Sequence, residues 1–303
     1  MERRVPFQVK EGEAGMTVGQ LLAKRGLTRR QISAAKFREE GICLNGVPVL
    51  VVALVEAGDL VEIRVETGRE VWDYLVPVPG PVEVFYEDED LIAVQKPAGL
   101  ASHPCGSHYQ NTMANRMAAY FAEKGEQVRI RAIGRLDRET SGVMVFAKNR
   151  AAAGHLVAQK EDGRFQKTYL ALVSGRLSRP CGIIDSPIGK GKGICMKVDA
   201  DGKRAVTRYR VLQEGEISAV LLQIRTGRTH QIRVHMASIG HPLLGDSLYH
   251  GDCSRMERTA LHAWKAFFIH PFTGKKIDVQ ADIPEDMRQV LGKRACFFHD
   301  MEV

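Results

Sequence analysis

The chain has 303 residues, of which 44% are hydrophobic, and it carries a formal net charge of +7 with a sequence pI near 9.1. This length suits about two domains, and no apolar run reaches the roughly 18 residues of a membrane-spanning helix. The charged first ten residues lack a signal-peptide core, which predicts a cytoplasmic protein, and the excess of basic residues favours an anionic partner, with RNA the leading candidate.

The pattern of cysteines and histidines predicts no metal centre. The six cysteines form neither a Cys-x-x-Cys pair nor a zinc-like cluster, so they indicate free thiols in a reducing compartment. No glycine-rich loop of the phosphate-holding kind is present, and we expect neither a metal nor a cofactor. The internal histidines, too scattered to be assigned as metal ligands, are His103, His230, His235, His241 and His262.

The N-terminal part predicts a compact group of helices and strands. Residues 18–40 favour two short helices, because apolar side chains recur there at helical spacing. Gly26 ends the first helix, and Thr28 is suited to cap the second. The Asn-Gly pair at 45–46 is a hairpin-turn signal between two apolar triplets, and a further strand is expected at 60–65.

These elements give a small αα-β domain over residues 1–68, whose order resembles that of the S4 RNA-binding module. Its basic side chains gather in the helical part, and several lie at helical spacing on one face. Such a face could meet a phosphate backbone, and an ordinary solvated helix face is the alternative. The predicted RNA-binding residues are Lys24, Arg25, Arg29, Arg30 and Lys36.

A proline-rich stretch at 69–81 predicts a linker to a second domain. Residues 82–295 alternate irregularly between β-type runs and helical stripes, which predicts an α+β fold with a mainly antiparallel mixed sheet. Residues 296–303 form a C-terminal tail. The expected helices are 113–121, 150–160 and 229–239, and the expected strands are 82–86, 91–95, 143–146, 167–174, 206–212, 219–225, 264–270 and 276–280.

The segment 134–142, GRLDRETSG, places one carboxylate, Asp137, between β-type runs at 130–133 and 143–146. Taken alone, Asp137 would be interpreted as a turn former, since aspartate is common in turns. Three other segments favour a catalytic role. They are 87–100 (EDEDLIAVQKPAGL) with His103-Pro104, 167–173 (KTYLALV), and 226–236 (TGRTHQIRVHM) with Gly240-His241-Pro242 and Gly245-Asp246.

In this order the four segments resemble the motifs of the RluA-type pseudouridine synthases, across about residues 82–280. The resemblance implies an enzyme that breaks the bond from ribose to uracil N1 and rejoins the ring through C5, without a redox cofactor or metal. It also implies a pseudouridine synthase catalytic domain. Asp137 matches the catalytic aspartate of the family, Tyr169 its active-site tyrosine and Arg233 its active-site arginine.

The reaction requires one ionised carboxylate in a dry pocket. Asp137 could attack C1′, add to C6 of the ring or remove the C2′ proton, and these routes stay open. Because arginine stays charged and can bind a carboxylate bidentately, we expect Arg233 to offset the burial of Asp137. Tyr169 is expected to stack on the flipped uracil. Ordinary strand packing is the alternative for Tyr169, and a phosphate-binding or surface position for Arg233.

The residues expected to contact the substrate are Arg135, Ile232, Arg228 and Lys167. Arg135 could enter the gap left by the flipped base or bind its phosphate, and a salt bridge to an acid such as Glu139 is the alternative. Ile232 belongs to the apolar wall or to the plain core. Gly134 departs from the resemblance, because most members have a histidine there, so we transfer no target site to this chain from the family.

The glycine-rich basic stretch 188–204 predicts a mobile strand extension over RNA, with Lys190 and Lys192 among its cations. A flexible solvated loop is the alternative. We expect a monomer that acts on large-subunit (23S) ribosomal RNA, with transfer RNA as the alternative substrate. A noncatalytic RNA-binding or ribosome-assembly protein on the same scaffold is the competing hypothesis, and the constellation of Asp137, Tyr169 and Arg233 argues against it.

Overall fold

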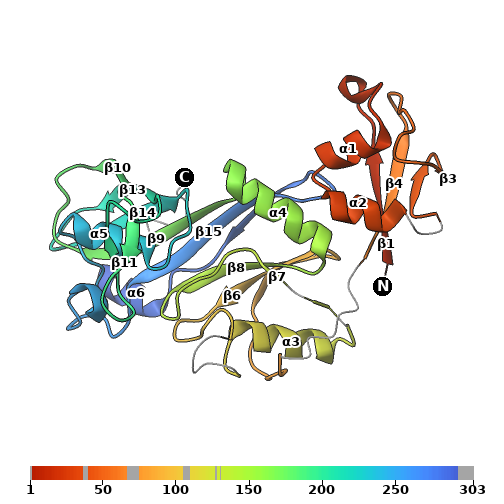
Figure 1. Cartoon of the computed structure of the whole chain (residues 1–303). Helices are drawn as coiled ribbons and strands as arrows, with labels where there is room; N and C mark the ends of the chain where they lie inside the picture. Colours follow the sequence, from red (N-terminus) through yellow and green to blue (C-terminus); the bar gives the residue numbers. More distant parts are fainter. Residues whose placement is uncertain are drawn as a thin grey trace.

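The computed structural model describes residues 2–36, 40–66, 75–104, 110–126, 128–129 and 131–292. A small N-terminal module sits beside a larger domain built on a ten-stranded sheet (Figure 1). Almost all strand pairs are antiparallel, with helices distributed between the strands, and this confirms the predicted α+β class. No helix within these ranges is long and apolar enough to cross a membrane.

In the N-terminal module the strands form one sheet of order β1-β4-β2-β3. Thr28 Oγ1 accepts the Gln31 backbone N–H at 3.3 Å, as predicted for a helix cap. Asn45 and Gly46 both have positive φ angles, as a two-residue hairpin turn requires. The elements are β1 (Glu2–Gln8), α1 (Val18–Lys24), α2 (Arg29–Lys36), β2 (Ile42–Leu44), β3 (Val47–Pro48) and β4 (Leu60–Glu66).

Strand β1 was not predicted. It pairs antiparallel with β4 along its whole length and buries Val5 and Phe7, with Val9 buried just beyond its end. The alternation of these three apolar residues is the ordinary strand signal, and the charged residues around it led us to interpret the segment only by its charge.

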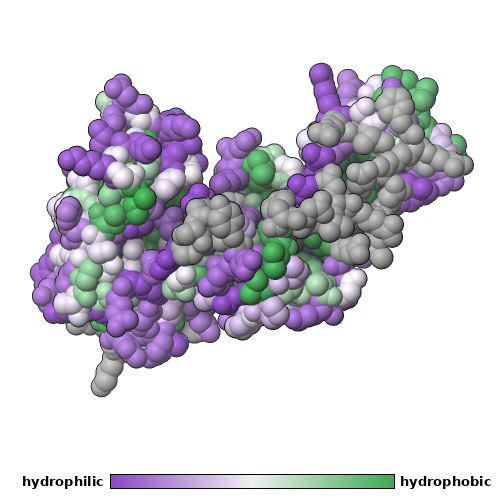
Figure 2. Space-filling view, turned by 60° about the horizontal axis from the view of Figure 1, so that its bottom comes forward, coloured by the Kyte–Doolittle hydropathy of each residue, from purple (hydrophilic) through white to green (hydrophobic). Residues whose placement is uncertain are grey.

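The outer end of the module, away from the larger domain, carries exposed apolar side chains, visible at the edge of an otherwise largely hydrophilic face (Figure 2). They belong to β3 and the loop that follows it. These residues take no part in the contact between module and domain described below. They are Val47, Leu50, Val52 and Leu54, each more than 60% exposed.

The larger sheet has the order β10-β13-β14-β9-β15-β8-β6-β5, with β16 beside β15 and β7 beside β8. All eight predicted strands are confirmed, and β8 runs parallel to β15. Strand β10 and the short hairpin β11–β12 were not separately predicted. The strands are β5 (Val84–Glu87), β6 (Leu91–Lys96), β7 (Arg131–Ala132), β8 (Ser141–Ala147), β9 (Gln166–Ser174), β10 (Cys181–Asp185), β11 (Ile188–Lys190), β12 (Met196–Val198), β13 (Val206–Gln213), β14 (Ile217–Ile224), β15 (Leu261–Ile269) and β16 (Lys276–Gln280).

Helices α3 (Met113–Glu123) and α4 (Arg150–Asp162) cover opposite faces of this sheet (Figure 1). The apolar run at the start of β6 explains how one strand serves both faces. Ile92 and Val94 pack with α3 residues such as Met117, whereas Leu91 and Ala93 pack with α4. A strand buried on both faces has a continuous apolar sequence instead of an alternating one. The remaining helices are α5 (Gln231–Ser238) and α6 (Glu285–Leu291).

The described part of the predicted linker, residues 75–81, has no regular secondary structure and is tied to α3. Leu75 is buried, and Asn115 of α3 donates its amide N–H to the Val76 carbonyl oxygen at 2.8 Å. The Val78 N–H in turn donates to the Asn115 carbonyl oxygen. The end of the linker therefore follows the larger domain. The predicted tail at 296–303 lies outside the described residues.

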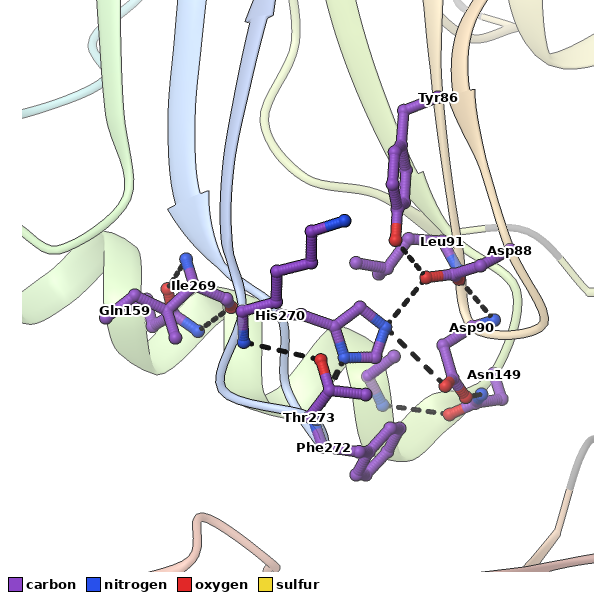
Figure 3. A network of polar contacts seen from close by, with 12 residues as sticks. Tyr86, Asp88, Asp90, Leu91, Asn149, Gln159, Ile269, His270, Phe272 and Thr273 are labelled. Atoms are coloured by element: carbon purple, nitrogen blue, oxygen red, sulfur yellow. Dashed lines mark hydrogen bonds and ion pairs between the residues drawn. The ribbon is translucent and has the colours of Figure 1, made fainter.

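A buried hydrogen-bond network fixes the turn before β6 to the β15–β16 turn (Figure 3). Asp88 Oδ1 accepts the backbone N–H groups of Asp90 and Leu91, each at 2.8 Å. Asp88 Oδ2 lies 2.8 Å from Nε2 of His270. The same network reaches the start of α4, because Asn149 donates to Asp90 and accepts the N–H of the first helical turn.

Asp88, Asp90 and His270 are also the group in the described part of the chain whose ligand atoms lie close enough, within 4.8 Å, to hold a metal ion. The tautomer of His270 argues against that use. Its Nδ1 accepts the backbone N–H groups of Phe272 and Thr273, so the ring proton is on Nε2 and faces Asp88. Neither nitrogen has a free lone pair, and the group is a structural network.

The N-terminal module packs directly on α4 and on the β15–β16 turn. The Phe7 and Phe272 ring centroids are 6.5 Å apart, and Phe272 also meets the ring of His155 at 5.5 Å. Gly26 lies against the same histidine. Burial, together with the charge of Arg164, lowers the pKa of His155 to about 4, so this contact is made by a neutral ring.

Replacing Gly26 by alanine is expected to weaken this contact. Gly26 has a φ of +89°, and a Cβ there would stand 2.5 Å from Cε1 of His155. Gly15→Ala is the matched control, because its φ is +80° with no atom within 4 Å of the added carbon. Both variants should lose about 1–2 kcal/mol of unfolding free energy from the left-handed backbone, and Gly26→Ala about 1–3 kcal/mol more from overpacking. Equal losses in denaturant unfolding would contradict the packed interface.

Candidate active site

A cavity of about 500 Å³ opens where the loop after β7, the end of α4, strands β9 and β14 and the start of α5 meet. The predicted catalytic and substrate-contacting residues come from three separated segments, and all of them line this cavity. They are Arg135 and Asp137 from the first segment, Lys167 and Tyr169 from β9, and Arg228, Ile232 and Arg233 from the third.

The loop that carries Asp137 is held on both sides of the aspartate. Ser102 Oγ donates to the Leu136 carbonyl oxygen at 2.6 Å and accepts the Leu136 N–H at 3.0 Å. On the other side, the fully buried Lys96 donates to the Arg138 carbonyl oxygen at 3.0 Å. Lys96 belongs to the 87–100 segment and Ser102 follows it closely, so this first motif supports the loop of the second.

One glycine of the loop segment is required by packing. Gly142 is the second residue of β8, next to β15, and its φ is +109°. A Cβ at this position would stand 2.2 Å from the Ala263 carbonyl oxygen, so glycine alone allows the two strands to pair. Gly142 therefore allows β8 to pair with β15 directly after the loop that carries Asp137.

Arg233 contacts two carboxylates, and its bidentate partner differs from the prediction. Its Nε and Nη2 donate to the two oxygens of Asp246, each at 2.7 Å. Nη1 lies 3.8 Å from Oδ2 of Asp137, which is an ion pair without a short hydrogen bond. Burial disfavours the charged guanidinium, but the hydrogen bonds and charge of Asp246 outweigh it and raise the pKa of Arg233. Asp246 thus holds the arginine, and the third nitrogen faces Asp137.

Tyr169 is 5% exposed and packs in the same core cluster as Leu136, Ile232 and Leu261. These side chains form one apolar wall of the cavity. Burial, and secondarily the negative charge of Asp137, raises the pKa of Tyr169 above its ordinary value. The phenol of Tyr169 therefore keeps its proton near neutral pH. Ile232 belongs both to the cavity wall and to the core, so both of its predicted positions are correct.

Lys167 is less available to a substrate than predicted. Its side chain is buried, and Nζ donates to the Val143 carbonyl oxygen at 3.0 Å. Burial, with a smaller effect from the charge of Lys160, lowers the pKa of Lys167 to about 7. It ties β9 to β8, and its charge is partly lost near neutral pH.

This lysine predicts a pH dependence of stability. Above about pH 7 the folded Lys167 loses its proton, while the unfolded chain keeps it to about pH 10.4. Unfolding then takes up a proton, so the free energy of unfolding should rise with pH between these values, by up to about 1.4 kcal/mol per unit. Lys167→Met should flatten this rise in urea unfolding measured from pH 7 to 10, whereas exposed Lys192→Met should not. The same slope in both variants would contradict the lowered pKa of Lys167.

The three arginines Arg135, Arg138 and Arg228 have different contacts. Arg138 Nε pairs with Glu139 at 3.1 Å, so the salt bridge considered for Arg135 is made by its neighbour. Arg135 itself is exposed at the cavity. Arg228 Nε donates to the Arg204 carbonyl oxygen at 3.0 Å, a structural contact that leaves the residue at the cavity wall.

Gly134, where the resemblance led us to expect a histidine, lies beside the ammonium group of Lys160. Its φ is +84°, and a Cβ there would stand 3.2 Å from Lys160 Nζ. Lys160 was not predicted, yet it lines the cavity from the end of α4. A cation thus stands next to the position where the family pattern has an imidazole.

The predicted RNA-binding residues lie away from the cavity, in two places. Lys190 is in β11, and Lys192 is in the loop of the β11–β12 hairpin. In the N-terminal module, Arg25 and Lys24 contact the buried carboxylate of Glu13 at 2.7 and 3.6 Å, so both also serve the fold. Arg29 and Lys36 are exposed on α2, and the side chain of Arg30 lies outside the described residues.

Besides Lys160, Asp246 and His230 also escaped the prediction. Asp246 was quoted only as part of a Gly-Asp pair, and His230 only as a scattered histidine. His230 has a positive φ of 55° immediately before α5 and lines the cavity. A non-glycine residue in this conformation is an uncommon feature that no sequence pattern indicated.

Comparison with solved structures places the fold among the RNA pseudouridine synthases. The human RNA pseudouridylate synthase domain containing 4 shares the fold with a TM-score of 0.58 and 22% identity, over 69% of this chain and 91% of that one. For domain containing 1, also human, the TM-score is 0.56 and the identity 28%, over 71% and 89%.

The sequence comparisons are more specific. Residues 90–238 match the family model described as RNA pseudouridylate synthase. The Bacillus subtilis protein named uncharacterized RNA pseudouridine synthase YjbO is 34% identical over 91% of this chain and 98% of its own length. A ribosomal large subunit pseudouridine synthase D from Zymomonas mobilis is 39% identical over 69% and 71%. The chain belongs to the RNA pseudouridine synthase family and is an enzyme of that class.

Proposed function

We propose that Asp137 is the catalytic carboxylate of this enzyme, that Arg233 is its charge partner and that the target uracil stacks on Tyr169. The observation that carries the proposal is the meeting of these three side chains, from three separated segments, at one cavity. An RNA-binding surface alone has no need of a buried arginine that is held by one carboxylate and directed at another.

The chemistry needs little besides an ionised carboxylate and a place for the ring to turn. The N1–C1′ bond breaks, the C5–C1′ bond forms, and the C5 hydrogen leaves as a proton while N1 gains one. Nη1 of Arg233 lies 3.8 Å from Oδ2 of Asp137 and places an opposite charge beside the carboxylate. Asp137 can then act as nucleophile or as base, and the geometry is compatible with each route.

The cavity has a size and lining that suit a flipped base. Its volume of about 500 Å³ falls within the range of small-molecule sites. The apolar wall of Leu136, Tyr169 and Ile232 can take the face of uracil. Stacking on an aromatic ring returns about 1–3 kcal/mol, comparable to the few kcal/mol that flipping costs.

The remaining cations of the cavity suit the phosphates beside the flipped nucleotide. Besides Arg233 and the buried Lys167, they lie around the walls and include two residues of the predicted set. Binding through such groups should weaken steeply as salt concentration rises. They are Arg135, Lys160, Arg208, Arg225 and Arg228.

Large-subunit ribosomal RNA is the proposed substrate. Several relatives, from Zymomonas mobilis and Nitrosomonas europaea among others, are named ribosomal large subunit pseudouridine synthase D. A folded RNA of this kind would also engage the exposed cations of the N-terminal module, such as Arg29. Such a substrate would place the protein in the cytoplasm. Transfer RNA is the alternative that the experiment below includes.

We further propose that the chain is divided into an S4-like RNA-binding domain at 1–68, a linker at 69–81, a catalytic domain at 82–295 and a tail at 296–303. The N-terminal sheet has its own apolar core, which supports the first boundary. We also propose that the protein acts as a monomer, because Asp137, Tyr169 and Arg233 meet at the cavity within a single chain.

The test is release of tritium from RNA labelled at uridine C5, because forming the new carbon–carbon bond expels that hydrogen. Large-subunit ribosomal transcripts and a transfer RNA pool are compared at equal uridine concentration. Release from the ribosomal transcripts alone supports the proposed substrate, and release from transfer RNA alone would replace it. No release from either RNA, despite tight binding, would contradict the proposal that the enzyme modifies free RNA.

A further inference from the structure

Tyr249 lies behind the cavity wall, in a short 3-10 turn (η2, Ser247–Tyr249) that begins directly after Asp246. Its side chain is 9% exposed and does not line the cavity. No sequence pattern singled it out. Its contacts nevertheless join three parts of the molecule: the ring makes one of them and the hydroxyl group makes the other two.

The ring of Tyr249 lies under the guanidinium group of Arg233, with Cζ 5.0 Å from the ring centroid. Asp246 already holds one edge of this guanidinium through Nε and Nη2. The aromatic face adds a contact perpendicular to that edge, in the geometry of a cation–π interaction. Edge and face together leave Arg233 one orientation, in which Nη1 faces Asp137.

The hydroxyl of Tyr249 makes two further contacts. Its oxygen accepts the backbone N–H of Met196 at 2.9 Å and lies 2.9 Å from Nδ1 of His230. Burial lowers the pKa of His230, so its imidazole is neutral near pH 7. The tyrosine O–H can then donate to Nδ1 while its oxygen accepts from Met196, which satisfies every group.

Met196 begins β12, so its hydrogen bond to Tyr249 reaches the β11–β12 hairpin. The hairpin is small, with Lys190 opposite Met196 in its register, and its turn carries Lys192. Beneath it, Ile188 of β11 packs with Tyr249 and with Val234 of α5 in a separate apolar cluster. The hairpin therefore rests on the helix that presents Arg233, and Tyr249 is its hydrogen-bonded attachment.

We propose that Tyr249 is a positioning residue that couples the seating of the β11–β12 hairpin on RNA to the orientation of Arg233 and His230 at the cavity. The inference rests on the proposed function, since it takes Arg233 as the partner of Asp137 and the hairpin lysines as RNA contacts. In this arrangement the hydroxyl serves the hairpin and His230, while the ring serves Arg233.

Two substitutions separate the hydroxyl from the ring. Tyr249→Phe keeps the ring and removes both hydrogen bonds, so KM for labelled ribosomal transcripts should rise about tenfold, with a drop in kcat of only about two- to threefold. Tyr249→Leu also removes the aromatic face, and kcat should fall by about tenfold more. Tyr209→Phe, at a tyrosine of β13 that does not line the cavity, is the control and should match the native enzyme.

A second readout does not depend on activity. Trypsin can cut the hairpin after Lys190, Lys192 or Lys197, and loss of the Met196 bond in Tyr249→Phe should speed cleavage there several-fold, with the rest of the chain cut at the native rate. Added ribosomal transcript should protect the hairpin of the native protein more than that of the variant. If both the kinetic constants and hairpin cleavage of Tyr249→Phe equalled those of the native protein, the proposal would be overturned.

The remaining outcomes are also decisive. Equal losses of kcat in the Phe and Leu variants, with hairpin cleavage unchanged, would reduce Tyr249 to a merely structural residue and overturn the coupling. A native enzyme that releases no tritium would instead count against the proposed function, and the trypsin comparison would then still support or refute the attachment of the hairpin.

Discussion

Asp137→Asn is expected to abolish pseudouridine formation, lowering the rate of tritium release by at least about 10³-fold, while RNA affinity stays within about threefold. The amide has nearly the shape of the carboxylate, so the loop held by Ser102 and Lys96 should keep its conformation. The amide lacks the ionised oxygen that acts as nucleophile or as base in every route considered for this reaction. Tritium release and filter binding on the same labelled transcript measure the two quantities.

Glu139→Gln is the matched control for this variant. Glu139 is on the same loop, but it pairs with the exposed side chain of Arg138 instead of Arg233. Its loss should change turnover by no more than about twofold, as is usual for a surface ion pair. Normal turnover by Asp137→Asn, or an equal loss in both variants, would show that the catalytic carboxylate lies elsewhere.

Apart from substitution of the proposed catalytic residue Asp137, Asp246→Asn should cause the largest combined loss of stability and activity. Asp246 is almost completely buried and provides both hydrogen bonds that hold Arg233. Removing one charge of a buried pair leaves the other uncompensated, at a cost of about 3–5 kcal/mol. The guanidinium is then free to turn toward Asp137 or away from the cavity, and we expect kcat to fall by about 10²-fold or more.

The chain provides a close control for this prediction in Asp286. Asp286 is also bonded bidentately by an arginine, with Nε and Nη2 of Arg258 at 2.6 and 2.9 Å, but its side chain is 43% exposed. Asp286→Asn should cost no more than about 1 kcal/mol and leave kcat near the native value. Urea unfolding and tritium release measure both variants. Equal destabilisation of the two would contradict the expected cost of breaking the buried pair of Asp246 and Arg233.

The contacts of Arg233 change how the arginine motif is understood. We expected one pair, between Arg233 and Asp137, and the structure has a chain of contacts in which Asp246 holds the edge of the guanidinium, Tyr249 its face, and Asp137 meets the remaining nitrogen. Asp246 stands only 13 residues from Arg233 in the sequence. Nothing in that spacing distinguished it from Asp137, because arginine binds any carboxylate that packing places within reach.

Several features of the fold followed from local patterns. The stripe that begins with Met113 became a helix with its buried face on the sheet, and the Asn45-Gly46 pair became a turn with two positive φ angles. These signals are local because side-chain periodicity and turn conformation depend on neighbouring residues. Strand β1 shows the limit, since its pairing with β4 depends on residues more than fifty positions away.

The sequence by itself determined the α+β class, most of the strands and helices, the family and the three segments that supply the cavity, because periodicity and motif order are properties of the chain. Only the tertiary structure decided which carboxylate holds Arg233, that Lys167 is buried against Val143, and that Lys160 stands beside Gly134. These outcomes depend on distances between segments far apart along the chain, and packing alone sets such distances.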